Sequence, residues 1–339
     1  MNGRLAPIFC IVLFLSGVDT SQALGQSASA EAHVEAARAA AYAPGQDFTW
    51  IIGELCAEPA PPRPATAAPP ATTAPTVRTI PPRADWYQAP AKLFDNLYYV
   101  GSYLQSIWAV TTSEGIILHD TAFDYMAESL ITEGLTELGL NAADIKYVIV
   151  SHGHGDHYLG AKYLQDTYGA RIIMSEADWR LMAGDDNPPE LKPRKDLIAT
   201  DGMELTLGDT TLTLYITPAH TPGTISTLIP LKDGHRWHLG SLWGGNGFGY
   251  RHFSGRAEAL STYSASAKRF QDITARARAD VYLSSHTNHD RTLDKINVVK
   301  FRTPDGPHPF VSSDAVRRHL TVVGECADAQ LAWLTNAPD

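Results

Sequence analysis

The sequence has only three cysteines and no C-x-x-C pair, which excludes a zinc ribbon or a redox-active dithiol motif. Positive charge is also scarce, since 27 Lys and Arg stand against 37 Asp and Glu and give a net charge of −10. Without a basic block to meet a phosphate backbone, we expect no nucleic-acid partner. The motifs S-x-x-K and G-x-S-x-G are absent as well, so the usual signals of a serine-nucleophile hydrolase are missing.

Long apolar runs are also lacking, and the single candidate lies at the N-terminus. Leu5–Val18 is too short for a comfortable transmembrane helix, which needs about 20 residues. It follows Arg4 and precedes the small residues of Ser21–Ala23, a pattern typical of a cleaved signal peptide. We therefore predict a signal peptide over residues 1–23 and a periplasmic or secreted protein with no stable membrane insertion. An uncleaved membrane anchor is the alternative.

Composition divides the rest of the chain into three parts. Residues 24–56 are rich in alanine with a weak helical pattern, and residues 57–83 are rich in proline, which favours an extended linker. Residues 84–339 form the main domain. Once Cys10 has left with the signal, Cys56 and Cys326 remain as an even pair in an oxidising compartment. We predict a disulfide between them, with two unrelated buried thiols as the alternative.

Short β-rich runs and helical patterns alternate through the main domain in two batches. If each batch forms a sheet with helices on its outer face, the fold is of the α/β class. The expected strands are 97–100, 104–111, 115–119, 146–151 and 171–175 in the first batch, and two within 203–217, then 225–230, 236–240 and 281–285 in the second. The expected helices are 124–138, 158–168, 258–278 and 314–335.

The strongest chemical signal follows the strand at 146–151, where three histidines and one aspartate occur within six residues. These residues are His152, His154, Asp156 and His157. Imidazole and carboxylate groups are the normal ligands of catalytic zinc. In an extended loop, positions two apart point the same way, so two of the imidazoles can reach one metal ion and the following pair a second.

Two later histidines also follow β-rich runs, and each completes a set of three ligands. We predict that one zinc ion binds His152, His154 and His220, and that a second binds Asp156, His157 and His286. Three protein ligands leave an open coordination position, as in catalytic rather than structural sites.

With these six residues in place, the sequence resembles the metallo-β-lactamase superfamily, whose motif is H-x-H-x-D-H followed by two distant histidines. The resemblance covers residues 93–290 and implies an αβ/βα four-layer sandwich with two Zn²⁺ ions at the strand ends. It also implies that Asp120 orients a ligand from outside the coordination sphere, and that Ser241 likewise lies outside that sphere. Many thioesterases and lactonases of this superfamily have a metal-bridging Asp where this chain has Ser241. Because it lacks this bridging Asp, the sequence resembles the third zinc subclass of class B β-lactamases.

The segment after Ser241 is the place to look for substrate contacts. The subclass has a second serine that helps to hold the drug carboxylate, and this chain has Trp243 there. We expect Trp243 and Phe248 as an apolar cleft wall, and Asn246 or Tyr250 as an oxyanion donor. Isolated histidines are usually packed or solvated residues, so the other histidines of the main domain and His33 are left outside the site: His119, His235, His238, His252, His289, His308 and His319.

These features predict an exported di-zinc hydrolase that opens a β-lactam amide by attack of a metal-bound hydroxide. Asp156 would be the catalytic residue, because it both binds the metal and orients the nucleophile. The substrate would be a small molecule. A same-fold lactonase, esterase or thioester hydrolase is the alternative activity. A binding or structural protein that keeps zinc without turnover is a third reading, which the complete ligand sets disfavour.

Overall fold

The computed structural model describes residues 20–43, 48–58 and 79–336. The first 19 residues of the predicted signal peptide and residues 59–78 of the predicted linker lie outside this range. Among the described helices, none combines the length and the apolar character that crossing a bilayer requires.

The first sheet has seven strands in the order of the sequence, β1 to β7. Pairing is antiparallel from β1 to β4 and parallel from β4 to β7. The strands are β1 (Ala91–Lys92), β2 (Leu97–Tyr99), β3 (Trp108–Thr112), β4 (Gly115–His119), β5 (Ile145–Ile149), β6 (Arg171–Ser175) and β7 (Leu197–Ala199).

The second sheet has five strands in the order β12-β11-β10-β9-β8. Only β11 and β12 pair in parallel, and the other neighbours are antiparallel. The strands are β8 (Met203–Leu207), β9 (Thr210–Ile216), β10 (Ile225–Asp233), β11 (Arg236–Trp243) and β12 (Val281–Ser284).

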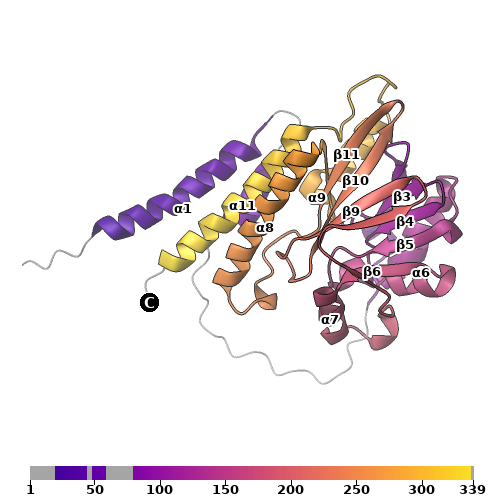
Figure 1. Cartoon of the computed structure of the whole chain (residues 1–339), viewed down its shortest axis with the longest axis horizontal. Helices are drawn as coiled ribbons and strands as arrows, with labels where there is room; N and C mark the ends of the chain where they lie inside the picture. Colours follow the sequence, from indigo (N-terminus) through magenta and orange to yellow (C-terminus); the bar gives the residue numbers. More distant parts are fainter. Residues whose placement is uncertain (1–19, 44–47, 59–78, 337–339) are drawn as a thin grey trace, which may run out of the picture.

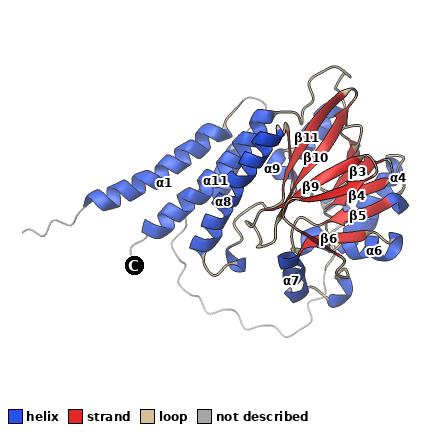
Figure 2. Ribbon diagram, in the orientation of Figure 1, coloured by secondary structure: helices blue, strands red, loops and turns tan. Residues whose placement is uncertain are grey.

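Alternation along the strands explains the layers. Ile117 faces the second sheet in a shared apolar core, whereas its neighbour Leu118 packs under the helices on the opposite face. Figure 2 shows the two sheets together with helices outside them. The fold is therefore the four-layer α/β sandwich expected from the sequence. Helices on the first sheet are α3 (Asp124–Ala127), α4 (Glu133–Glu137), α6 (Ala161–Tyr168) and α7 (Glu176–Gly184), with a π-helical turn at Glu128–Thr132. Those on the second are α8 (Arg256–Ala277) and α11 (Ser313–Asn336).

The alanine-rich N-terminal segment packs against the C-terminal helix. Helices α1 (Thr20–Ala41), α11 and α8 lie side by side, and α2 (Thr49–Leu55) joins their apolar cluster (Figure 1). The guanidinium of Arg318 donates to the carbonyl of Ala41 at 3.2 Å. Cys56 and Cys326 form a disulfide, the pairing that the sequence predicted. Through it α2 is linked covalently to α11.

Several elements differ from the sequence-based expectation. The strand expected from residue 104 begins only at Trp108, because the Ser102 hydroxyl accepts hydrogen bonds from the amides of Leu104 and Gln105 and closes a turn there. The helix expected at 158–168 is divided into α5 (Gly155–Tyr158) and α6. Helices α7, α9 (Thr287–Asp290) and α10 (Thr292–Val299) and strand β7 were not anticipated.

Candidate metal centre

The six candidate ligands come from three loops that follow strands of both sheets. The loop after β5 and the short α5 carry His152, His154, Asp156 and His157. His220 lies between β9 and β10, and His286 follows β12. Because β5 belongs to the first sheet and the other strands to the second, the sandwich brings both sheets to one site.

The first set, His152, His154 and His220, offers three imidazole nitrogens within 4.8 Å of one another. The Nδ1 of His154 lies 3.0 Å from the Nε2 of His220. The Nε2 of His152 is buried and has no hydrogen-bond partner among the described residues. A buried imidazole nitrogen beside two others is an unsatisfied group that a metal ion would satisfy.

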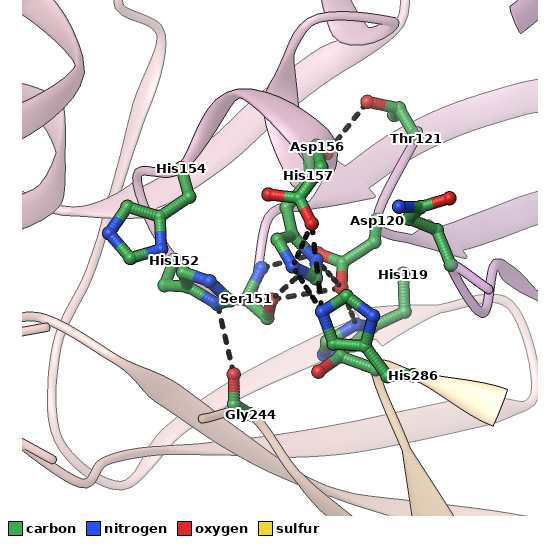
Figure 3. A network of polar contacts seen from close by, with 12 residues as sticks. His119, Asp120, Thr121, Ser151, His152, His154, Asp156, His157, Gly244 and His286 are labelled. Carbon is green, nitrogen blue, oxygen red and sulfur yellow. Dashed lines mark hydrogen bonds and ion pairs between the residues drawn. The ribbon is translucent and has the colours of Figure 1, made fainter. Parts of the chain in front are cut away.

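The second set, Asp156, His157 and His286, is equally compact (Figure 3). The Nε2 atoms of His157 and His286 lie 3.2 Å apart, and the Asp156 Oδ2 lies 3.4 Å from the first and 3.6 Å from the second. Ligands about 2.0–2.1 Å from a tetrahedral zinc ion lie about 3.3 Å from one another. The donor set and its spacing therefore fit a divalent metal of the zinc type.

Backbone carbonyls fix the orientation of two imidazoles in the first set. His152 Nδ1 lies 3.0 Å from the carbonyl oxygen of Gly244, and His220 Nδ1 lies 3.0 Å from that of Gly247. A proton on each Nδ1 that donates to the carbonyl leaves each Nε2 with its lone pair toward the site. The glycine-rich segment after β11 therefore orients two of the candidate ligands.

Asp120 occupies the position beside the second set that the sequence predicted. It follows β4 with a φ of 64°, a conformation that Asp tolerates better than most residues. Its carboxylate accepts from the amide and the hydroxyl of Ser151 at 2.7 and 2.9 Å, and its Oδ2 lies 2.9 Å from His157 Nδ1. Asp120 thus orients His157 and ties the end of β4 to the loop that carries the candidate ligands.

Most of the candidate ligands are held as neutral imidazoles, the form that binds metals. Burial lowers the pKa of His154 to about 2 and lowers those of His220 and His286 to about 4. Burial alone would also lower the pKa of His157, but the carboxylates of Asp156 and Asp120 outweigh it and raise that pKa to about 9. A metal binding to the second set must displace this proton.

The predicted substrate residues are placed differently. Trp243 does not line a cleft, because its side chain is fully buried between Tyr263 and Phe270 and its indole N–H donates to Tyr263. Ser241 is buried in β11, and among the described residues its side chain makes no hydrogen bond to a candidate ligand.

The other three predicted substrate residues lie on the segment after β11. The amide of Asn246 donates to the hydroxyls of Ser284 and Ser285, which directly precede His286, so this side chain braces a ligand loop. Phe248 and Tyr250 are half-buried and pack against each other, with ring centroids 5.8 Å apart.

One residue left out by the sequence analysis lies directly beside the first set. The Nε2 of His252 is 2.7 Å from the Nε2 of His154, on the side of that ring opposite to His220. The guanidinium of Arg251 reaches the same nitrogen of His154 at 3.1 Å. Neither residue belongs to a spacing motif, so only the folding of the loop onto His154 reveals them.

Comparison with known proteins gives a consistent result. Residues 100–233 match the family model described as "Metallo-beta-lactamase superfamily". The crystal structure of BJP-1, a subclass B3 metallo-beta-lactamase of Bradyrhizobium japonicum, is similar with a TM-score of 0.62 and 27% identity, over 75% of this chain and 98% of that one.

Two curated proteins are similar over shorter stretches. A probable metallo-hydrolase of Bacillus subtilis, YybB, is 24% identical over 35% of this chain and 53% of its own length. A hydroxyacylglutathione hydrolase of Rhizobium johnstonii is 29% identical over 34% of this chain and 42% of its own. The chain thus spans about half the length of the curated relatives it matches.

Proposed function

We propose that this chain is an exported di-zinc hydrolase of the metallo-β-lactamase superfamily that opens the amide of a β-lactam ring. The match of residues 100–233 to the family model and the similarity to a subclass B3 enzyme structure support this proposal. The observation that carries the proposal is the pair of adjacent triads, three imidazoles in one and a carboxylate with two imidazoles in the other. Both the family and the donor sets support a metal-dependent hydrolase.

Zinc ions held by the two triads would polarise the substrate carbonyl and lower the pKa of a bound water. The residues of this chain have complementary tasks. The Asp156 carboxylate is about a quarter exposed, so it faces the solvent from which the nucleophile comes. His157 and His152 are buried and form the base of the site.

The absence of a carboxylate at Ser241 favours a β-lactam over a thioester. A serine hydroxyl is a poor zinc ligand, so no side chain from β11 would bridge the two metals. The alternative, hydrolysis of a lactone, another ester or a thioester, is favoured by the similarity to the hydroxyacylglutathione hydrolase. The proposal of export to the periplasm or beyond depends on the signal pattern of residues 1–23. The disulfide agrees with it, because disulfides form and persist mainly in oxidising compartments.

The decisive experiment uses purified full-length protein loaded with zinc. We expect rapid hydrolysis of a chromogenic cephalosporin and slow hydrolysis of a lactone and thioester panel. EDTA treatment and the Asp156→Asn substitution should each abolish hydrolysis. A preference for the lactone or thioester would replace the β-lactam assignment, and full activity of the metal-free protein would contradict the whole proposal.

A further inference from the structure

Asp178 is a fully buried carboxylate that is not one of the candidate ligands. It lies in the first turn of α7, directly after β6, and its amide donates to the Ser175 hydroxyl that caps the helix. A cap of this kind satisfies the backbone of the helix without any help from the Asp178 side chain. The carboxylate is therefore available for other contacts.

Those contacts join two ligand loops. The Asp178 Oδ2 accepts from the amide of Gly153 at 3.0 Å and from the hydroxyl of Thr221 at 2.6 Å, and its Oδ1 accepts from the amide of Gly223 at 3.1 Å. Gly153 lies between His152 and His154, and Thr221 directly follows His220. One side chain thus holds both segments that supply the three-histidine set.

The backbone at these positions is shaped for the carboxylate. A Cβ atom on Gly223 would lie 2.8 Å from the Asp178 Cγ and 1.9 Å from the Ser175 Oγ. A Cβ atom on Gly153 would lie 2.9 Å from the Asp178 carbonyl oxygen. Only glycine lets both loops come this close to α7.

Burial of this carboxylate opposes folding, so stability alone does not explain the arrangement. Burial raises the pKa of Asp178 to about 6, which means that ionisation of this carboxyl is opposed by loss of solvent. Three donors from two loops nevertheless require an acceptor with two oxygens. An asparagine side chain could accept through one atom only, because its amide nitrogen donates.

We propose that Asp178 is a positioning residue that holds the segment of His152 and His154 at the distance from His220 that metal binding by the three-histidine set requires. This inference rests on the metal site of the proposed function. It concerns metal binding at one set, so it can fail while hydrolysis of a β-lactam is confirmed.

The test measures zinc affinity of the first set alone. A His286→Ala background removes a ligand from the second set, and zinc competition with a chromogenic chelator then reports the three-histidine set. In this background we expect Asp178→Asn to weaken zinc binding by about 10- to 100-fold, the usual effect of losing a hydrogen-bond partner that orients ligands. Circular dichroism on the same samples establishes that each variant is folded.

Asp290 provides a matched control. It is also fully buried, with its pKa raised to about 6 by burial, and it accepts from the amides of Ser284 and Thr292 and the hydroxyl of Thr292. Within the described part of the chain, none of its hydrogen-bond partners lies in the loops that carry His152, His154 and His220. Asp290→Asn should therefore leave zinc affinity of the three-histidine set within about twofold of the background, whatever its effect on stability.

A second pair of variants covers the case in which Asp178→Asn does not fold. Thr221→Val removes one donor to Asp178, whereas Thr221→Ser keeps the hydroxyl. We expect Thr221→Val to weaken zinc binding several-fold and Thr221→Ser to restore it. The proposal would be overturned if a folded Asp178→Asn protein bound zinc as tightly as the His286→Ala background does. If Asp178→Asn does not fold, the same result for Thr221→Val would overturn it. An equal loss in Asp290→Asn would also overturn it.

Discussion

At the scale of single residues, the site depends on buried polar groups that have few alternatives. His157 donates to Asp120 on one side and faces Asp156 on the other, so two carboxylates determine both its orientation and its raised pKa. Removing either carboxylate changes the histidine as well as the metal site. Effects at these positions should therefore be larger than their individual hydrogen bonds suggest.

Asp120→Asn provides a first prediction. The amide cannot accept from Ser151 and His157 as the carboxylate does, so we expect zinc affinity of the second set to fall by about 10- to 100-fold. In the metal-free protein the pKa of His157 should fall below about 9, as measured by NMR titration. Asp209→Asn, at an exposed turn, is the control. An unchanged His157 titration would contradict this view of Asp120.

Asp290 gives a prediction about pH. Its pKa is raised by burial from 3.8 to about 6 in the folded state, so the folded protein holds this proton more tightly than the unfolded chain does. The stabilisation is complete below pH 4 and is lost as the pH rises through 6. A shift of about two pH units corresponds to about 3 kcal/mol.

The measurement is the free energy of unfolding of metal-free protein in urea between pH 3.5 and 7. The unfolding free energy of wild type minus that of Asp290→Asn should decrease by up to about 3 kcal/mol as the pH rises across this range. The substitution removes the titration of residue 290 and keeps all the others. A difference that is constant with pH would contradict the assignment.

At the scale of elements, the segment between β11 and α8 determines the geometry of the first set. Its carbonyls receive the Nδ1 protons of His152 and His220, and this requires the chain to pass close to the His220 backbone. A Cβ atom on Gly249 would lie 1.8 Å from the His220 carbonyl oxygen. The glycines of this segment are therefore needed for close approach of two backbones.

Gly249→Ala should displace the loop and disturb His220. We expect a loss of about 1–3 kcal/mol in unfolding free energy, typical of overpacking, together with a loss of metal from the first set. Metal content by elemental analysis and urea unfolding check both parts. Gly255→Ala is the matched control, because a Cβ atom there meets no atom within 4 Å. Equal behaviour of the two variants would refute the close-approach argument.

At the scale of the whole molecule, the N-terminal segment stabilises the second sheet from outside. Helices α1 and α2 pack on α11, and the disulfide between Cys56 and Cys326 closes a loop with a sequence separation of 270. The candidate metal ligands lie within this loop, although neither cysteine is near them in the chain.

Replacing both cysteines by alanine should therefore reduce the free energy of unfolding by about 2–5 kcal/mol while the metal stoichiometry of the folded protein stays the same. Urea unfolding and elemental analysis measure the two quantities. Loss of metal from the folded double variant would indicate that the disulfide supports the site directly.

The first four candidate ligands and the pattern of the sheets could be predicted from the sequence because both are local, whereas His220 and His286 were assigned from their positions after β-rich runs. His152 to His157 are adjacent in the chain, and the alternation of strands and helices repeats within each batch. The partners of the ligands were harder to predict. Two of these partners, Gly244 and Gly247, contact the imidazoles through their backbone carbonyl oxygens. A third, His252, reaches His154 from a loop 98 residues later in the chain. No spacing rule in the sequence predicts either kind of contact.

Trp243 is a residue whose position the sequence did not predict correctly. Its position beside Ser241 suggested a cleft residue, but strand alternation turns its side chain into the core beneath α8. The sequence by itself determined which donor atoms are available, because imidazole and carboxylate chemistry belongs to the residue type. Only the tertiary structure decided which groups orient those donors, because that depends on which loops the two sheets bring within hydrogen-bonding distance.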